Sequence, residues 1–285
     1  MSTAKTQQNK MNKKFISAVL AIVILLSAAV LMLDLRLKTV YYSVENSKNS
    51  ATARIVFISD LHCCSYGEDQ EKIIEAVRAQ NPDTVLFGGD MFDHKLDPEP
   101  TLTVMKALSS EYRCYYAMGN HENGRNDKNS LLKTVEELGI TVLSGDFAEI
   151  KEGIALIGIS DPTSYGDYSQ SGSERMSLAM EHLESVKKSD EDFSVLLFHR
   201  PENPKEYASL GFDLVLSGHA HGGQWRIPGI LNGLYAPHQG LFPEYAGGFY
   251  KIENTVMIVS RGLAKESNAV PRIFNRPEIV VIDIT

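Results

Sequence analysis

Short runs of apolar residues alternate along most of this chain with longer segments in which apolar residues recur at helical spacing. The run RIVFIS at 54–59 is continuous and rich in β-branched residues, as expected of a strand covered on both faces. We predict a short strand at 39–44 and further strands at 84–87, 112–118, 141–143, 193–198, 213–217, 255–260 and 279–284. We predict helices, each with one apolar face, at 68–80, 99–109, 128–138 and 174–186. Alternating strands and helices indicate an α/β domain.

Two regions depart from this alternation. The runs 147–150 and 154–160 are joined by Lys-Glu-Gly, which predicts a β-hairpin. The stretch 218–248 is rich in glycine and proline, so we predict mostly loop there, and a loop of this length is more often functional than filler. With no internal repeat and no low-complexity tract, the pattern indicates one domain with mixed sheets at 54–285.

The N-terminal segment has a different composition. Residues 15–33, FISAVLAIVILLSAAVLML, carry no charge and as a helix could just cross a hydrocarbon layer about 30 Å thick. A cleavable signal peptide is the alternative, but the apolar run continues beyond the weak cleavage site at 27–29. Four lysines precede the run. We therefore predict a cytoplasmic basic N-terminus at 1–14, a retained single-pass transmembrane anchor at 15–33, a linker at 34–53 and an extracytoplasmic domain, which places the protein at the cell membrane.

Charge and cysteine content limit the classes of partner. The formal net charge is −8, which provides no broad cationic surface for a nucleic-acid backbone, so we expect no nucleic-acid partner. Phosphate chemistry is still open, because a bound metal ion can supply positive charge locally. The three cysteines Cys63, Cys64 and Cys114 do not form a disulfide framework. Cys63 and Cys64 could bind a metal ion, but we interpret them as small buried side chains.

Metal-binding side chains follow five of the predicted strands. Ligand sites in α/β sheets lie beyond the carboxyl ends of strands, so these clusters should converge in one crevice. The glycines that precede Asp90, Asn120 and His219 are expected to let the backbone turn tightly. The clusters are Asp60-Leu61-His62, Gly89-Asp90, Gly119-Asn120-His121-Glu122, His199-Arg200-Pro201 and Gly218-His219-Ala220-His221.

The donor types in these clusters indicate which metal ions would bind. Hard oxygen donors together with imidazole nitrogens suit Mn, Fe or Zn better than Ca²⁺ or a structural zinc site. Seven donors exceed the need of one ion, whereas two divalent metal ions that share a carboxylate could use them all. The candidate ligands are Asp60, His62, Asp90, Asn120, His199, His219 and His221.

The ordered series of motifs resembles that of the calcineurin-like metallophosphoesterases, and the resemblance extends over the whole domain. It implies two mixed β-sheets packed as a sandwich flanked by helices. It also implies one metal ion held by Asp60, His62 and His221, a second held by Asn120, His199 and His219, and Asp90 as the bridge between them. Three segments resemble those of a membrane-associated bacterial branch related to UDP-2,3-diacylglucosamine hydrolase-like phosphoesterases. They are the motif GHAHGGQW, the loop APHQGLFPEYAGGFY and the C-terminal segment PRIFNRPEI.

The resemblance implies a hydrolase that cleaves a phosphoester or pyrophosphate bond with a metal-activated water, on a membrane-linked or envelope-linked substrate. His121 directly follows a metal-binding residue, so it is placed to protonate the leaving group. Glu122 could orient His121, but we expect Glu122 to be exposed. Arg226 and His238, in the long loop, are candidate substrate contacts.

The expected partners are a phosphorylated small molecule or lipid-linked substrate, and the membrane through the N-terminal helix. A protein or nucleotide phosphatase with the same centre is an open alternative. A non-catalytic metal-binding module on the cell surface is another, but such a module should lack a ligand or the acid, and this sequence has both.

Overall fold

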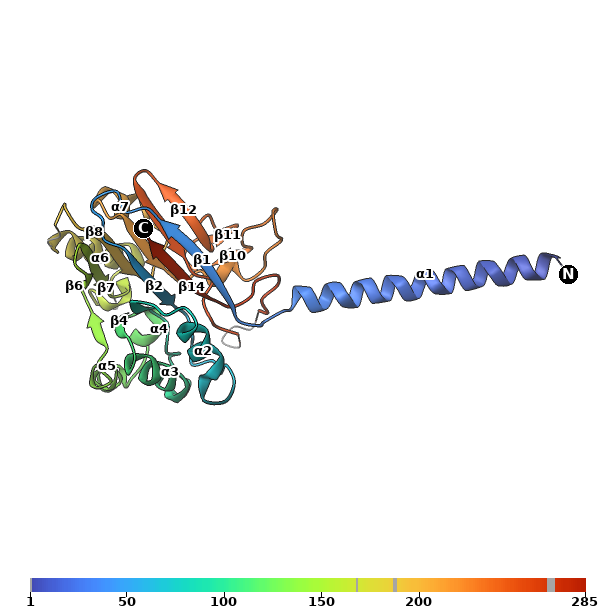
Figure 1. The fold of residues 1–285 in the computed structure, drawn as a ribbon, viewed down its shortest axis with the longest axis horizontal. Helices are drawn as coiled ribbons and strands as arrows, with labels where there is room; N and C mark the ends of the chain where they lie inside the picture. Colours follow the sequence, from blue (N-terminus) through green and yellow to red (C-terminus); the bar gives the residue numbers. More distant parts are fainter. Residues whose placement is uncertain (1, 168, 187–188, 266–269) are drawn as a thin grey trace.

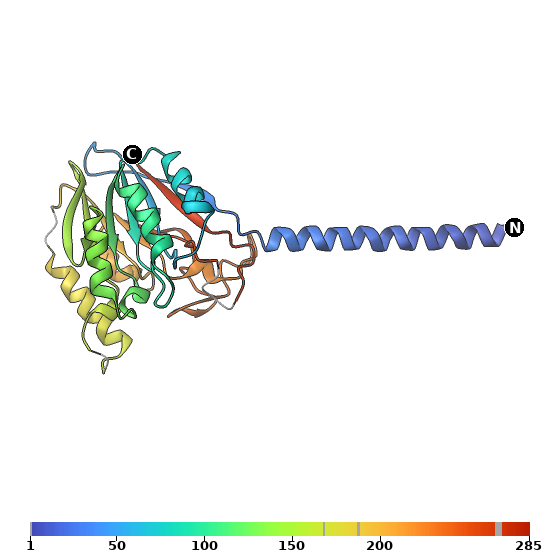
Figure 2. The same cartoon turned by 90° about the horizontal axis from the view of Figure 1, so that it is seen from below.

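The computed structural model describes residues 2–167, 169–186, 189–265 and 270–285. The first helix, α1 (Ser2–Met32), projects from the body of the molecule (Figures 1 and 2). Within these described ranges, no helix is both long and apolar enough to cross a lipid bilayer. The predicted transmembrane anchor at 15–33, and with it the single-pass location at the cell membrane, is therefore wrong.

Two six-stranded mixed sheets form the body of the molecule. In the first sheet, β14 runs antiparallel to β2, and the remaining neighbours are parallel. Its strands, in spatial order, are β1 (Lys38–Val44), β14 (Glu278–Ile284), β2 (Ala53–Ile58), β3 (Thr84–Gly88), β4 (Arg113–Ala117) and β5 (Thr141–Leu143).

The second sheet has four parallel strands at its centre and an antiparallel strand at each edge. In spatial order its strands are β12 (Gly248–Ile252), β13 (Thr255–Val259), β9 (Leu214–Ser217), β8 (Phe193–Phe198), β7 (Ile154–Ile159) and β6 (Asp146–Lys151). The antiparallel pair β6 and β7 is the predicted hairpin.

Successive residues of a strand face opposite sides of its sheet, and this alternation builds three apolar cores. Ile55 and Phe57 of β2 point into the core between the two sheets, whereas Val56 and Ile58 point into the core under the helices. Helices α2 (Glu71–Arg78), α3 (Glu99–Ser109) and α5 (Lys128–Glu137) cover the first sheet, and α6 (Gly172–Ser185) and α7 (Pro204–Ser209) cover the second. The predicted helix-flanked sandwich of two mixed sheets is confirmed.

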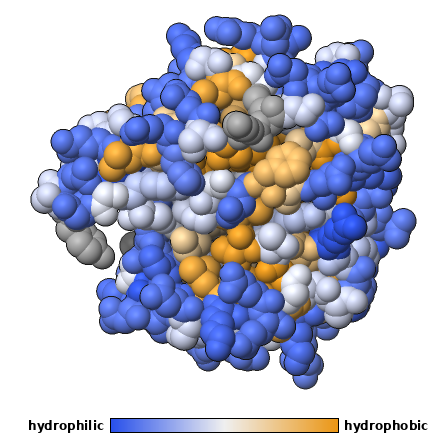
Figure 3. Space-filling view, turned by 90° about the vertical axis from the view of Figure 1, so that its left-hand side faces the viewer, coloured by the Kyte–Doolittle hydropathy of each residue, from blue (hydrophilic) through white to orange (hydrophobic). Residues whose placement is uncertain are grey.

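Several short elements were not predicted from the sequence. They are α4 (Asn120–Asn123), α7, β12 and the small hairpin formed by β10 (Tyr235–Ala236) and β11 (Gly240–Leu241). Each is too short to show a clear period in its apolar residues. The face that carries β6 and α6 is largely hydrophilic, with apolar side chains gathered near its centre (Figure 3).

Candidate metal centre

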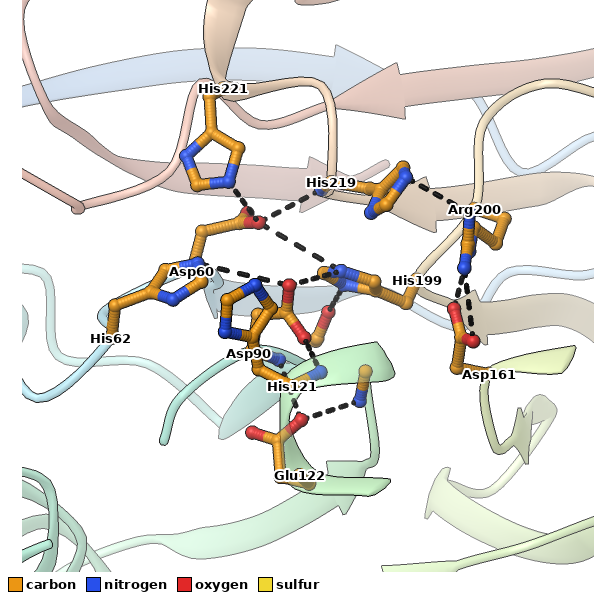
Figure 4. A network of polar contacts seen from close by, with 12 residues as sticks. Asp60, His62, Asp90, His121, Glu122, Asp161, His199, Arg200, His219 and His221 are labelled. Carbon is orange, nitrogen blue, oxygen red and sulfur yellow. Dashed lines mark hydrogen bonds and ion pairs between the residues drawn. The ribbon is translucent and has the colours of Figure 1, made fainter. Parts of the chain in front are cut away.

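Five strand ends, three from the first sheet and two from the second, bring the candidate ligands together. Strands β2, β3 and β4 lead into the segments with Asp60, Asp90 and Asn120, and β8 and β9 lead into those with His199 and His219. In Figure 4 Asp60, Asp90, His199 and His221 point toward one another. Asn120 is partly exposed, and the other six candidate ligands are buried.

The side chains form two sets that share one residue. Asp60, His62, Asp90 and His221 place one ligand atom each within 4.8 Å of one another, and Asp90, His199 and His219 do the same. The Asp90 Oδ2 atom lies 3.1 Å from His199 Nε2 and 3.7 Å from His62 Nε2. Asp90 therefore stands between the two sets, where a shared carboxylate was predicted.

The backbone around these side chains has an unusual conformation. Five candidate ligands are non-glycine residues with positive φ, a region that costs an L-residue of order 1–3 kcal/mol. Surrounding contacts must hold these residues in the strained conformation. This conformation directs their side chains inward from the strand ends. The residues are Asp60 (52°), His62 (48°), Asp90 (48°), His219 (65°) and His221 (47°).

Of the three glycines expected to allow tight turns, Gly89 has a positive φ of 84°. Gly119 and Gly218 are needed for a different reason: there is no room for a Cβ atom at either position. A Cβ atom on Gly119 would overlap with the carboxylate of Asp90, and one on Gly218 would overlap with that of Asp60. These two glycines allow the backbone to approach both carboxylates closely.

Hydrogen bonds to the backbone fix the orientation of several candidate ligands. His199 Nδ1 lies 2.7 Å from the carbonyl oxygen of Gly88, so the Nδ1–H donates there and Nε2 faces Asp90. Asp60 Oδ1 accepts from the backbone N–H of His219 at 3.0 Å, and Asp90 Oδ1 accepts from that of His121 at 2.8 Å. The donors are thus held in place by the protein itself.

Buried polar atoms without partners show that the site fits metal ions. Buried polar groups in proteins are nearly always hydrogen-bonded, so a cluster of exceptions requires an explanation. Five of the seven candidate ligands have such an atom, and metal coordination would satisfy one atom of each of them. The atoms with no hydrogen-bond partner among the described residues are Asp60 Oδ2, His62 Nδ1 and Nε2, Asn120 Oδ1, His199 Nε2 and His221 Nδ1.

The electrostatics of the cluster also favour a cation. Burial raises the pKa of Asp60, as expected for a carboxylate removed from water. Burial also lowers the pKa of His199, but the carboxylates of Asp90 and Asp60 outweigh it and raise that pKa to about 10. Two buried carboxylates thus draw positive charge into the site, and metal ions would supply it.

His121 lies at the edge of the cluster, as predicted. Its side chain is partly exposed, and its ring centroid lies 4.4 Å from that of His62. Its Nδ1 atom lies 3.4 Å from Asp93 Oδ2 and 3.1 Å from His94 Nδ1. Asp93 therefore faces His121, a contact that our sequence analysis missed although Asp93 follows Asp90 by three residues.

Glu122 is buried, so the expectation that it is exposed is wrong. Its Oε2 atom accepts from the backbone N–H groups of Asp90 at 3.1 Å and Gly119 at 2.9 Å, and its Oε1 accepts from that of Phe92 at 3.0 Å. The carboxylate thus ties the loop after β3 to the loop after β4. It positions the backbone of the site, and does not orient His121 through a hydrogen bond.

Arg200 and Asp161 form a buried ion pair beside the cluster, which the sequence did not indicate. The guanidinium binds Asp161 through both Nε and Nη2. Its Nη1 atom lies 3.0 Å from His219 Nε2 and also contacts His238 Nδ1. In the sequence, only the position of Arg200 next to His199 indicated that Arg200 lies near the site. Asp161 follows β7 and is distant from both residues along the chain.

The two candidate substrate contacts have different positions. His238 lines the same cleft as His62, Asp90 and His121, and its Nδ1 atom lies 3.0 Å from His219 Nε2. The structure does not bring Arg226 to this cleft. The Arg226 guanidinium donates to the carbonyl oxygen of Gly222 and to Asn232, and it borders a separate hollow.

The two adjacent cysteines are buried, as predicted. Cys63 Sγ lies 3.4 Å from the backbone nitrogen of Asp93, and Cys64 Sγ lies 3.4 Å from that of Lys265. These contacts hold the thiols in loops next to the site, where they act as small packing groups.

Comparison with known proteins agrees with this geometry. The chain matches the calcineurin-like phosphoesterase family over residues 53–223. It is 30% identical over 254 residues to the uncharacterized metallophosphoesterase Cj0846 of Campylobacter jejuni, which covers 87% of this chain and 62% of that protein. It is 26% identical over 246 residues to the phosphodiesterase YaeI of Escherichia coli, which covers 83% of each.

This chain therefore belongs to the calcineurin-like phosphoesterase family. It spans less than two thirds of the length of the Campylobacter protein. The narrower resemblance to UDP-2,3-diacylglucosamine hydrolase-like enzymes stays a prediction.

Proposed function

We propose that this metallophosphoesterase hydrolyses a phosphodiester at a centre of two divalent metal ions that share Asp90. The main support is the position of Asp90 within hydrogen-bonding or ion-pair distance of both sets of candidate ligands. The partnerless buried atoms around it offer coordination to both ions. The relative in Escherichia coli is named a phosphodiesterase, which favours a diester.

In this proposal, Asp60, His62 and His221 hold one ion, and Asn120, His199 and His219 hold the other. Carboxylate, amide and imidazole donors together suit Mn, Fe or Zn. Two such ions, when bound, neutralise charge on the phosphoryl oxygens and provide an activated water as the nucleophile. The chain itself fixes the orientation of the donors: the Gly88 carbonyl accepts from His199, and the backbone N–H groups of His121 and His219 donate to Asp90 and Asp60.

His121 is the proposed general acid. Its Nδ1 atom faces Asp93, which leaves the Nε2 atom to hold a proton for the departing oxygen. His121 lines the cleft together with Asp90 and His62, so a leaving group bound there is within its reach. A protein or nucleotide phosphatase with the same centre differs from this proposal in its substrate, a monoester.

The test is the substitution Asp90→Asn in the purified protein. It removes the charge that screens two cations from each other, so metal content should fall toward one ion or fewer. Hydrolysis of bis(4-nitrophenyl) phosphate should be lost at the same time. Metal content is measured by inductively coupled plasma mass spectrometry, and activity by release of 4-nitrophenolate in Mn²⁺.

Asp97→Asn is the matched control, because Asp97 is an exposed aspartate between β3 and α3 that contacts no candidate ligand among the described residues. It should keep both the metal and the activity. Two retained ions and normal turnover in Asp90→Asn would contradict the shared-carboxylate assignment. Preference of the wild type for 4-nitrophenyl phosphate over the diester would favour the phosphatase alternative.

A further inference from the structure

Glu202 lies in the segment that joins β8 to α7, three residues after the candidate ligand His199. Its side chain is 11% exposed, and both of its carboxylate oxygens are buried without a hydrogen-bond partner among the described residues. A buried carboxylate that lacks hydrogen bonds is costly, so its presence requires an explanation. Because both oxygens are closed off from solvent, a partner for them has to come from the protein itself.

Three nitrogen atoms of the protein face Glu202 Oε1. They are His219 Nε2 at 3.5 Å, Arg200 Nη1 at 3.6 Å and His238 Nδ1 at 3.8 Å. Of these three residues, His219 is a candidate ligand of the second metal ion, and the other two are not. Glu202 therefore stands next to a metal-binding histidine, where a carboxylate can act on the ring.

The two ring nitrogens of His219 have different surroundings. Nε2 lies 3.0 Å from Arg200 Nη1 and 3.0 Å from His238 Nδ1, on the side of the ion pair between Arg200 and Asp161 (Figure 4). A metal ion at Nε2 would be repelled by the adjacent guanidinium, since both are positively charged. The nitrogen that can bind the second ion is therefore Nδ1, and Nε2 then carries the ring proton.

A protonated Nε2 needs a hydrogen-bond acceptor, and among its described neighbours only Glu202 can provide one. The Arg200 guanidinium has donors and no acceptor. His238 Nδ1 contacts Arg200 Nη1, which can only donate, so the lone pair of that imidazole nitrogen is already in use. The Glu202 carboxylate is left, and a shift of about 0.5 Å would bring its Oε1 into hydrogen-bond distance of Nε2.

We propose that Glu202 is a positioning residue for the second metal ion. Its carboxylate accepts from the Nε2–H of His219, holds the ring with Nδ1 toward the ion, and makes that nitrogen a stronger donor to the metal. His199 is held in the same way by the carbonyl oxygen of Gly88. The negative charge of Glu202 also attracts the nearby cation. This inference rests on the proposed binding of the second ion by His219.

The experiment measures metal binding and does not depend on turnover. Chelator-treated wild type, Glu202→Met and Glu202→Gln are titrated with Mn²⁺ and followed by isothermal titration calorimetry and EPR spectroscopy. Methionine is similar to glutamate in size and has no oxygen acceptor, so affinity for the second ion should fall by about 10- to 100-fold. Glutamine keeps an acceptor oxygen without the charge, so its loss should be smaller. Both variants should bind the first ion with unchanged affinity.

Three other variants identify which ion is lost. His219→Ala and His221→Ala give the reference EPR spectra for loss of the second and of the first ion. At low Mn²⁺, Glu202→Met should give the spectrum of His219→Ala. Glu206→Met, at an exposed glutamate of α7, is the matched control and should bind both ions like the wild type.

Stability separates this role from a purely structural one. Glu202→Met replaces a carboxylate without hydrogen bonds by an apolar side chain of similar size, while Arg200 keeps its two contacts with Asp161. Replacing buried charge by a well-packed apolar group is often neutral or stabilising. In chelator-treated protein, the urea midpoint of Glu202→Met should therefore equal or exceed that of the wild type, although its affinity for the second ion is lower.

The outcomes distinguish this inference from the proposal on which it rests. A wild type that binds fewer than two Mn²⁺ ions would contradict the centre of two ions, and this inference with it. Two ions in the wild type, with the same affinities in Glu202→Met, would mean that Glu202 does not support His219. Weaker binding of both ions with a lower urea midpoint would mean that Glu202 acts on the fold as a whole. Selective loss of the second ion at an unchanged or higher midpoint supports the inference.

Discussion

Replacement of Glu122 by alanine should lower both the stability of the protein and its affinity for metal ions. The Glu122 carboxylate accepts three backbone hydrogen bonds, from Asp90, Phe92 and Gly119, at distances of 2.9 to 3.1 Å. Alanine leaves all three N–H groups buried without an acceptor. Each such group costs about 1–3 kcal/mol, so the free energy of unfolding should fall by about 3 kcal/mol or more.

Glu122→Gln is predicted to have a smaller effect. Its amide keeps one acceptor oxygen, which can occupy the position of Oε2 and retain the bonds from Asp90 and Gly119. The NH₂ group then faces the N–H of Phe92, and one hydrogen bond is lost. The glutamine variant should therefore lose about a third as much stability as the alanine variant, about 1 kcal/mol or slightly more.

Urea unfolding of the chelator-treated protein measures these differences without a contribution from bound metal. Glu184→Ala is the control, because an exposed glutamate should change stability by less than about 0.5 kcal/mol. The metal affinity of Glu122→Gln should fall by about 10- to 100-fold, since residues that hold metal ligands have effects of this size. Unfolding of Glu122→Ala at the urea concentration of the control would refute the reasoning.

Three other predictions concern the leaving group, the metal ions and the thiols. His121→Ala should lose about 10²–10⁴-fold in rate on an alkyl ester and far less on a nitrophenyl ester, with unchanged metal content; equal losses would mean that His121 does not act as an acid. Chelation should lower the thermal midpoint and Mn²⁺ should restore it, because ligands that bind the folded state stabilise it; an unchanged midpoint would argue against a metal site. Burial raises the pKa of Cys114 to about 12 and also raises that of Cys63, and Cys64 is buried as well. Since thiolate forms only as the pH approaches the pKa, iodoacetamide at pH 8 should label these thiols only after unfolding, as mass spectrometry would show.

Most of the sheet structure could be predicted from apolar runs. The strands at 54–59, 84–87, 193–198 and 213–217 agree with β2, β3, β8 and β9 to within one residue at each end. These strands are central and covered on both faces, so their sequences are almost continuously apolar. The edge strand β12 alternates between partly buried and exposed residues over only five positions, and it begins at the last residue of the predicted loop.

The long N-terminal apolar run led to a prediction that failed. Hydropathy over a window predicts a membrane span from composition alone. The described part of the chain contains no helix that meets both the length and the apolarity that a span requires. The anchor and the membrane location that followed from that run are therefore withdrawn.

The position of a polar residue after a strand was a sound guide to the candidate ligands, but it said nothing about the residues that support them. Glu122 was expected to be exposed, yet three backbone donors make its burial favourable. Asp161 lies 39 residues before Arg200 along the chain, and only the parallel pairing of β7 with β8 brings them together.

The sequence by itself determined the alternation of strands and helices, the family and the set of candidate ligands, because these depend on local patterns of residue type at fixed spacing. The tertiary structure decided which side chains meet. It placed Asp90 between the two ligand sets, buried Glu122 under two loops and placed Arg226 beside a separate hollow. Such contacts join residues that are distant along the chain, and they depend on how the two sheets pack against each other, which no local pattern encodes.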